Sequence, residues 1–325
     1  MRILITGITG FVGSHLAEYI LNEHPGNEVY GIKRWRSPRN HISEIEQRIT
    51  LYDGDLNDLS SLITILNQVK PEIIFHLAAQ SFVSSSYTAP ADTINTNVVG
   101  TANLLEAIRI TKNDPVIHVC SSSEVYGQVD KSQVPINEST HLNPVSPYAV
   151  SKVGEDMLAY MYHQAYKLKT VRSRMFTHSG PRRGEVFVDS FFALQLAKIE
   201  QGKQKPVLKT GNLDSVRTFC DVRDTVKAYW LLVNKCAPGE VYNIGGNRTM
   251  TIRDMLDLLL SMSSIKDEIK VETDPKLMRP ADVTLQIPDC SEFTKVTGWE
   301  PSIPYEQTLN DMLEYWRLEV KHERI

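Results

Sequence analysis

The chain lacks the features that mark several broad classes of protein. Its 325 residues include only four cysteines, at widely separated positions and with no Cys-x-x-Cys pair. A disulfide framework or a cysteine-based zinc site is therefore not expected, and no other metal is expected; unpaired thiols favour a reducing cytoplasm. No apolar run approaches the roughly eighteen residues that span a bilayer, so no membrane association is expected. Thirty-five basic and thirty-nine acidic residues give a net charge of −4, which argues against nucleic-acid binding.

The first half of the chain alternates short apolar runs with amphipathic stretches. Apolar residues are 42% of the sequence, enough for a sizeable core. We expect strands at 3–6, 28–32, 72–78 and 116–122, and helices at 11–23, 59–69 and 97–112. This alternation predicts right-handed crossovers and an α/β fold, a Rossmann-type doubly wound parallel sheet.

The pattern changes after about residue 170. A strand runs into a polar loop over 170–185, a helix is expected over 221–235, a strand over 239–246 and a second helix over 251–264. We expect residues 1–172, joined by 213–244, to form the Rossmann domain. Residues 173–212 and 245–325 then form a smaller domain on the carboxyl edge of the sheet, where such sheets bind ligands.

A glycine pattern follows the first expected strand. Gly7, Gly10 and Gly13 precede a helix, an arrangement that lets a pyrophosphate approach the backbone and the helix N-terminus. At the end of the second strand stands Lys33-Arg34-Trp35-Arg36, without the carboxylate that would bind a ribose 2′-hydroxyl. The basic character of Arg34 favours NADP over NAD.

Two further segments carry reactive side chains. Ser121–Gly127 ends the fourth strand, and Ser146–Lys152 enters a helix. Tyr148 and Lys152 are four residues apart and share one helical face. The ammonium favours the phenolate of Tyr148, which could take a proton from a sugar hydroxyl while hydride passes to the cofactor.

These motifs resemble the extended short-chain dehydrogenase/reductase family, and within it the enzymes that convert GDP-mannose to GDP-4-keto-6-deoxymannose and the reductases that act on that product. The resemblance implies that Tyr148, with Ser122 and Lys152, oxidises C4 of the sugar. Glu124 then removes the C5 proton and relays it to the departing C6 hydroxyl, and the hydride returns to C6. The dehydratases have threonine at the position of Ser122, which keeps the hydroxyl. An exposed glutamate capping a neighbouring helix is the alternative reading of Glu124.

The same resemblance implies the remaining site residues, and makes the first domain NADP-binding and the second nucleotide-sugar-binding. The expected NADP contacts are Gly7, Gly10, Phe11, Val12, Gly13, Arg34, Asp55, Leu56, Leu77, Ala78, Ala79, Tyr148, Lys152 and His178. The expected contacts to a GDP-linked sugar are Ser81, Ser123, Thr177, Val188, Asn212, Arg217 and Arg279. The basic loop of the dehydratases reaches a neighbouring subunit, which implies a homodimer or homotetramer, with Trp35 as a candidate contact.

Several positions keep alternatives open. Thr177 stands where the dehydratases have asparagine, and Ser190-Phe191 replaces an Arg-Lys pair. The C-terminal half is more similar to the reductases. The expected activity is that of a GDP-mannose 4,6-dehydratase that recycles its hydride on NADP. The alternatives are an NADPH-dependent reductase of the 4-keto-6-deoxy sugar, a dehydratase of another GDP-sugar such as a heptose, and a non-enzymatic dinucleotide sensor.

Overall fold

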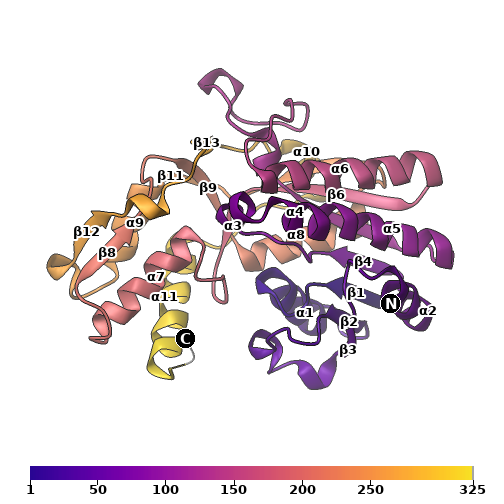
Figure 1. Ribbon diagram of the computed structural model, residues 1–325, viewed down its shortest axis with the longest axis horizontal. Coiled ribbons are helices and arrows are strands. Elements are labelled where there is room, and N and C mark those ends of the chain that lie inside the picture. The colour runs from indigo at the N-terminus through magenta and orange to yellow at the C-terminus, as the bar shows by residue number, and fades with distance from the viewer. Residues whose placement is uncertain (324–325) are drawn as a thin grey trace.

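The computed structural model describes residues 1–323 and has two lobes (Figure 1). The larger lobe is built on a seven-stranded sheet in the order β10-β6-β5-β4-β1-β2-β3, in which every pair is parallel. Its strands are β1 (Arg2–Thr6), β2 (Glu28–Lys33), β3 (Thr50–Asp53), β4 (Ile73–His76), β5 (Val116–Ser122), β6 (Lys169–Met175) and β10 (Val241–Ile244). The predicted doubly wound parallel sheet is confirmed.

Helices cover both faces of this sheet because its strands are apolar on both sides. In β1, Ile3 and Ile5 pack with α1 (Phe11–Glu23) and α8 (Val222–Lys235). The residue between them, Leu4, packs on the opposite face with α2 (Leu59–Val69) and α5 (Gly100–Thr111). Successive side chains of a strand point to opposite faces, so one strand contributes to two cores. Alongside α5 lies α6 (Pro147–Tyr166), which packs on β5.

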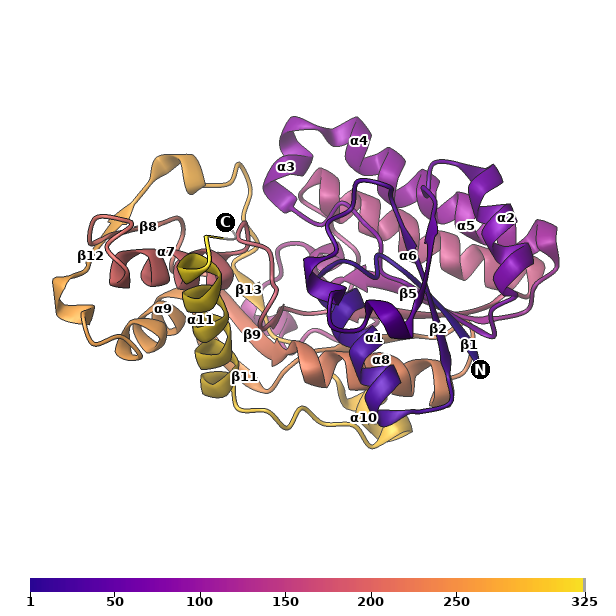
Figure 2. The same ribbon diagram turned by 90° about the horizontal axis from the view of Figure 1, so that it is seen from below.

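The smaller lobe is formed by short strands and three longer helices (Figure 2). Its helices α7 (Val188–Glu200), α9 (Ile252–Ser261) and α11 (Tyr305–Lys321) enclose a separate apolar core. Strand β9 (Val216–Asp221) pairs with β7 (His178–Ser179), β11 (Arg248–Thr251) and β13 (Leu285–Gln286). A second small sheet pairs β8 (Val207–Thr210) with β12 (Lys270–Thr273) in parallel.

Short elements connect the two lobes and the main helices. They are α3 (Val83–Thr88), α4 (Pro90–Ile94), a π-helical turn (Asn95–Val99), α10 (Ser291–Thr297), and 3₁₀ turns at Asn40–Ile42, Glu46–Arg48, Ser123–Tyr126, Lys131–Gln133, Lys266–Glu268 and Pro275–Leu277. The helix expected over 97–112 therefore begins as a π-helical turn. Over residues 1–323, no helix is long and apolar enough to cross a membrane, and no three His, Cys, Asp or Glu side chains cluster as a metal site would need.

The division of the chain into two domains stays a prediction. The segment 213–244 does send α8 and β10 to the large sheet, but β9 within it pairs in the smaller lobe. Likewise, β6 continues in the large sheet through Met175, three residues beyond the expected boundary. Phe293 and Trp299 also pack into the core of the larger lobe.

Candidate active site

A cleft of about 1510 Å³ lies at the carboxyl ends of the large sheet and is lined by both lobes. All the site residues expected from sequence line it, although they come from segments far apart in the chain. They are Gly7, Gly10, Phe11, Val12, Gly13, Arg34, Asp55, Leu56, Leu77, Ala78, Ala79, Ser81, Ser122, Ser123, Glu124, Tyr148, Lys152, Thr177, His178, Val188, Asn212, Arg217 and Arg279. Their individual roles remain predictions.

The turn after β1 has the shape of a diphosphate cradle. Gly7 has φ of +74° and its carbonyl accepts a 3.0 Å hydrogen bond from the Gly10 amide. A Cβ atom at Gly13 would lie 2.2 Å from the Gly7 oxygen, so α1 packs directly against the turn. No side chain caps the N-terminus of α1, which leaves its first amides available to an anion. These residues fit the dinucleotide expected from the sequence.

A buried hydrogen-bond network fixes the neighbouring strand ends beneath the cradle. The Thr101 hydroxyl donates to the Asn97 carbonyl at 2.6 Å and contacts His76 Nε2 at 2.9 Å. His76 Nδ1 lies 2.9 Å from Thr6 Oγ1, which also accepts from the two backbone amides that follow His76. Since the Thr101 proton is committed, Nε2 donates and Nδ1 accepts. Burial lowers the pKa of His76 to about 3, so this neutral ring is maintained.

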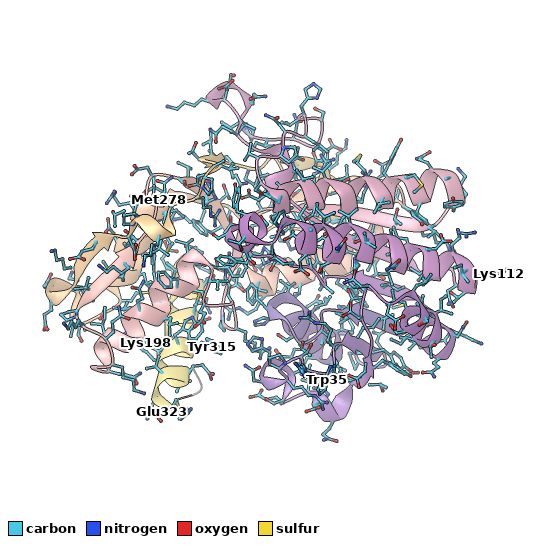
Figure 3. The ribbon with its side chains drawn as sticks, in the orientation of Figure 1. Trp35, Lys112, Lys198, Met278, Tyr315 and Glu323 are labelled. Carbon is cyan, nitrogen blue, oxygen red and sulfur yellow. The ribbon has the colours of Figure 1, made fainter. Side chains whose placement is uncertain are left out.

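The end of β2 carries positive charge. Arg34 and Lys33 line the cleft, and Lys33 forms an ion pair with Asp53 at the end of β3. Trp35 is 72% exposed on the larger lobe (Figure 3), and the Arg36 guanidinium lies 4.5 Å from its ring centroid. Arg34 thus follows the carboxyl end of β2 and lies on the lining of the cleft.

The Tyr148 phenol lies in the first turn of α6, whose N-terminus is capped by Ser146. Burial raises the pKa of Tyr148 to about 12, while the nearby Lys152 ammonium and a hydrogen bond with Ser122 oppose that rise. Lys152 is itself buried, and its backbone carbonyl accepts a hydrogen bond from Ser121 Oγ at 3.2 Å. The tyrosine and lysine therefore share one face of α6 next to the end of β5, as their spacing predicts.

Glu124 is the second residue of the 3₁₀ turn Ser123–Tyr126 that follows β5. The Ser122 hydroxyl caps that turn by accepting from the Glu124 amide at 3.2 Å. The Glu124 carboxylate instead faces the smaller lobe, where Gln286 Nε2 lies 3.5 Å from its Oε1. Glu124 also lines the cleft, so a carboxylate reaches the same space as Tyr148.

Charged and polar side chains of the smaller lobe line the other end of the cleft. Asn212 donates to Asp282 at 2.8 Å, and Arg217 and Arg279 each lie 3.8 Å from the same carboxylate. Burial lowers the pKa of Arg217. Two guanidinium groups beside one carboxylate retain donors for a further anion, and a diphosphate suits their planar geometry.

An aromatic stack connects the two halves of the cleft. His178 stacks on Phe11 with ring centroids 5.8 Å apart and planes 2° from parallel. Burial lowers the pKa of His178 to about 4, so the ring is neutral at pH 7. Thr177 precedes His178 in the chain and also lines the cleft. Val188, the first residue of α7, belongs to the same lining.

Four further polar residues belong to the site, and the sequence resemblance already connects one of them, Asp282, with Arg279 at the nucleotide diphosphate. Asp282 contacts Asn212 within the smaller lobe, and Gln286 contacts Glu124 across the two lobes. Arg183 lines the cleft and pairs with the buried Asp189. Glu155 is buried beside Lys152, with Nζ and Oε2 2.7 Å apart. Only Glu155 has a local signal in the sequence, because residues three apart on a helix are neighbours.

Comparison with known proteins places this site in one family. Residues 4–312 match the family model described as GDP-mannose 4,6 dehydratase. A GDP-mannose 4,6-dehydratase of Yersinia enterocolitica is 33% identical over 96% of this chain and 92% of its own. A GDP-6-deoxy-D-mannose reductase of Pseudomonas aeruginosa is 31% identical over 99% of both chains.

A solved structure agrees with these relatives. The structure of RMD from Pseudomonas aeruginosa complexed with NADPH superposes with a TM-score of 0.84, at 30% identity over 98% of this chain and 100% of that one. The expectation of an enzyme of the extended short-chain dehydrogenase/reductase type is thereby confirmed, and the chain belongs to the GDP-mannose 4,6-dehydratase family.

Proposed function

We propose that the protein is a GDP-mannose 4,6-dehydratase that binds NADP and converts GDP-mannose to GDP-4-keto-6-deoxymannose. The observation that carries this proposal is the position of Glu124, whose carboxylate lines the same cleft as Tyr148 and Lys152. A 4,6-dehydration needs a second acid–base group beyond the tyrosine, because a proton must leave C5 and a hydroxyl must leave C6.

NADP, when bound, accepts a hydride from the sugar and later returns it. Residues of the cradle after β1 would hold its diphosphate, and Arg34 would hold the ribose phosphate that distinguishes NADP from NAD. The stacked rings of Phe11 and His178 line the same cleft.

The chain's own residues move the protons. Tyr148, assisted by Lys152 and Ser122, takes the proton of the C4 hydroxyl as that carbon is oxidised. The resulting 4-ketone acidifies the C5 proton, which Glu124 removes and delivers to the C6 hydroxyl as it departs as water. C5 regains a proton when the hydride is returned to C6, and the proton that Tyr148 took from the C4 hydroxyl balances it. At the other end, Arg217 and Arg279 bind the diphosphate of the nucleotide.

A second candidate is a reductase that uses NADPH to reduce a GDP-4-keto-6-deoxy sugar. It is supported by the Pseudomonas aeruginosa reductase, which this chain matches over 99% of both lengths. The two activities differ in stoichiometry, since the dehydratase returns its hydride and the reductase consumes one NADPH per turnover. Measuring NADPH consumed per sugar converted therefore tests the proposal: none supports the dehydratase, and one per sugar supports the reductase.

Three finer points belong to the same proposal. A GDP-linked heptose is an alternative substrate, because Thr177 occupies a position that is asparagine in the dehydratases the sequence resembles. The four free cysteines suit a cytoplasmic enzyme. We also propose a homodimer or homotetramer, since Val150, Met157 and Tyr160 form part of an exposed apolar surface on α6.

A further inference from the structure

A second carboxylate lies beneath the Tyr148/Lys152 pair, where the proposed reaction does not use it. Glu155 is one turn beyond Lys152 on α6, and the side chains are 2% and 5% exposed. The Lys152 ammonium donates to Glu155 Oε2 at 2.7 Å. The other oxygen, Oε1, is buried without a hydrogen-bond partner among residues 1–323. An unsatisfied buried carboxylate oxygen is costly, so this group needs an explanation beyond packing.

Among the charged groups around Glu155, Lys152 is the cation that pairs with it. On α6 its charged or titratable neighbours are Tyr148, Lys152 and Asp156. Asp156 is held by two arginines of β6, with Arg172 Nη1 at 2.7 Å and Arg174 Nε at 2.8 Å.

The sheet beneath α6 contributes no further charge at neutral pH. Cys120 on β5 has a pKa raised by burial. His118 on β5 and His76 on β4 have pKa values lowered by burial to about 3. These three side chains are therefore neutral, and the charge balance is set by Lys152 and Glu155.

We propose that Glu155 is a positioning residue that holds the Lys152 ammonium and offsets part of its charge, and thereby sets how readily Tyr148 loses its proton. One ammonium serves two anions, the carboxylate and the phenolate. While the carboxylate is charged, the Lys152 ammonium stabilises the phenolate less. Tyr148 therefore stays protonated to higher pH. This inference rests on the role proposed above for Tyr148.

The pKa shifts have the directions that this arrangement requires. Burial raises the pKa of Glu155 to about 7, against the opposing attraction of Lys152. Burial also opposes the charge of Lys152, but Glu155, through its charge and its hydrogen bond, together with Tyr148 and Cys120 more than offsets that effect, so the pKa of Lys152 is raised. Glu155 therefore changes charge near neutral pH. Below that pH its carboxyl group is neutral, and Tyr148 then loses its proton more readily.

The test compares charge removal at Glu155 with charge removal at its neighbour. In Glu155→Gln the Tyr148 pKa should fall by about one unit, the effect typical of losing a nearby like charge. Glu155→Asp keeps the charge and should restore most of the wild-type value. The matched control is Asp156→Asn, which also removes a buried carboxylate of α6 but one paired with Arg172 and Arg174, and it should leave the Tyr148 pKa unchanged.

The primary readout is the ultraviolet difference titration of tyrosinate in the protein without substrate or cofactor, with Tyr148→Phe defining the contribution of Tyr148. The acid limb of the kcat–pH profile should move in the same direction. If Glu155→Gln does not fold, Glu155→Met removes the same charge with an apolar side chain of similar length.

An unchanged Tyr148 pKa in the folded Gln or Met variant overturns the inference, as does an equal shift in Asp156→Asn. Because this titration needs no substrate, it is independent of the reaction. A shifted titration in a protein that does not dehydrate GDP-mannose would overturn the proposed function alone.

Discussion

Gln286 on β13 lies 3.5 Å from Glu124, its Nε2 atom facing Oε1 of the carboxylate across the cleft. Glu124 belongs to the larger lobe and Gln286 to the smaller one, so the group proposed to move the C5 proton is contacted from both. Gln286 is buried, and its amide nitrogen donates to the carboxylate. The smaller lobe thereby contributes to the acid–base group as well as to nucleotide binding.

Glu124→Gln should separate the two halves of the proposed reaction. Loss of the carboxylate should slow water elimination by about 10²- to 10⁴-fold, the usual contribution of a general base. Oxidation at C4 should survive, seen as NADPH absorbance on mixing the NADP-loaded variant with GDP-mannose. Glu292→Gln, on the exposed face of α10, is the control. Wild-type turnover in Glu124→Gln would remove the base role from this residue.

Tyr148→Phe should abolish turnover and weaken NADP binding far less, because Tyr148 is one of many expected NADP contacts. The phenol moves a proton in the first step, so a loss of at least about 10²-fold is expected, whereas the cradle around Gly7 is untouched. Turnover with GDP-mannose and NADP affinity by calorimetry give the two readouts. Measurable turnover in the wild type that vanishes in Tyr148→Phe also rules out a protein that only senses dinucleotides. Retention of full activity would contradict the assignment of Tyr148.

Arg34→Ser should reduce the preference for NADP over NAD. The guanidinium can form charge-assisted hydrogen bonds to a 2′-phosphate that NAD lacks, so NADP binding should weaken by about 1.5–3 kcal/mol while NAD binding changes little. Arg36→Ser is the matched control, because Arg36 packs over Trp35. Equal weakening of both cofactors in Arg34→Ser would show that Arg34 does not read the phosphate.

His118→Phe should flatten the acid side of the stability profile. His118 is fully buried, and burial lowers its pKa from 6.5 to about 3. As the pH falls, His118 is therefore protonated in the unfolded chain before it is protonated in the folded protein. Its contribution to the unfolding free energy is complete above pH 6.5 and is lost as the pH falls towards 3. Between pH 7 and pH 5, this residue accounts for about 2 kcal/mol of the lost unfolding free energy.

Denaturant titrations at the two pH values measure that loss. His118→Phe should lose about 2 kcal/mol less than wild type, whatever its absolute stability. The surface substitution His141→Gln serves as control. An identical loss in wild type and His118→Phe would contradict the buried neutral state of His118.

The large sheet and the cofactor end of the cleft were predictable because their signals are local. Apolar runs such as 3–6 alternate with helical periodicity, and Gly7, Gly10 and Gly13 lie within seven residues at a strand-to-helix turn. Tyr148 and Lys152 share a helical face by spacing alone. The same helical spacing places Glu155 beside Lys152. The importance of this ion pair becomes evident only when the burial of both side chains is known.

The smaller lobe was not predictable in the same way because its contacts are long-range. Asn212 meets Asp282 seventy residues away, and Gln286 meets Glu124 across 162 residues. Strands β8 and β12 are short, and no periodicity in either identifies the other as its partner. Such pairings depend on how the lobe packs as a whole, which one sequence does not encode in any single segment.

Mass spectrometry of GDP-mannose after incubation with the protein and NADP tests the central claim most directly. The dehydratase account predicts a product lighter by one water, with the added NADP neither consumed nor accumulated as NADPH. An unchanged mass of GDP-mannose, with protein able to reduce a GDP-4-keto-6-deoxy sugar at the expense of NADPH, would contradict it.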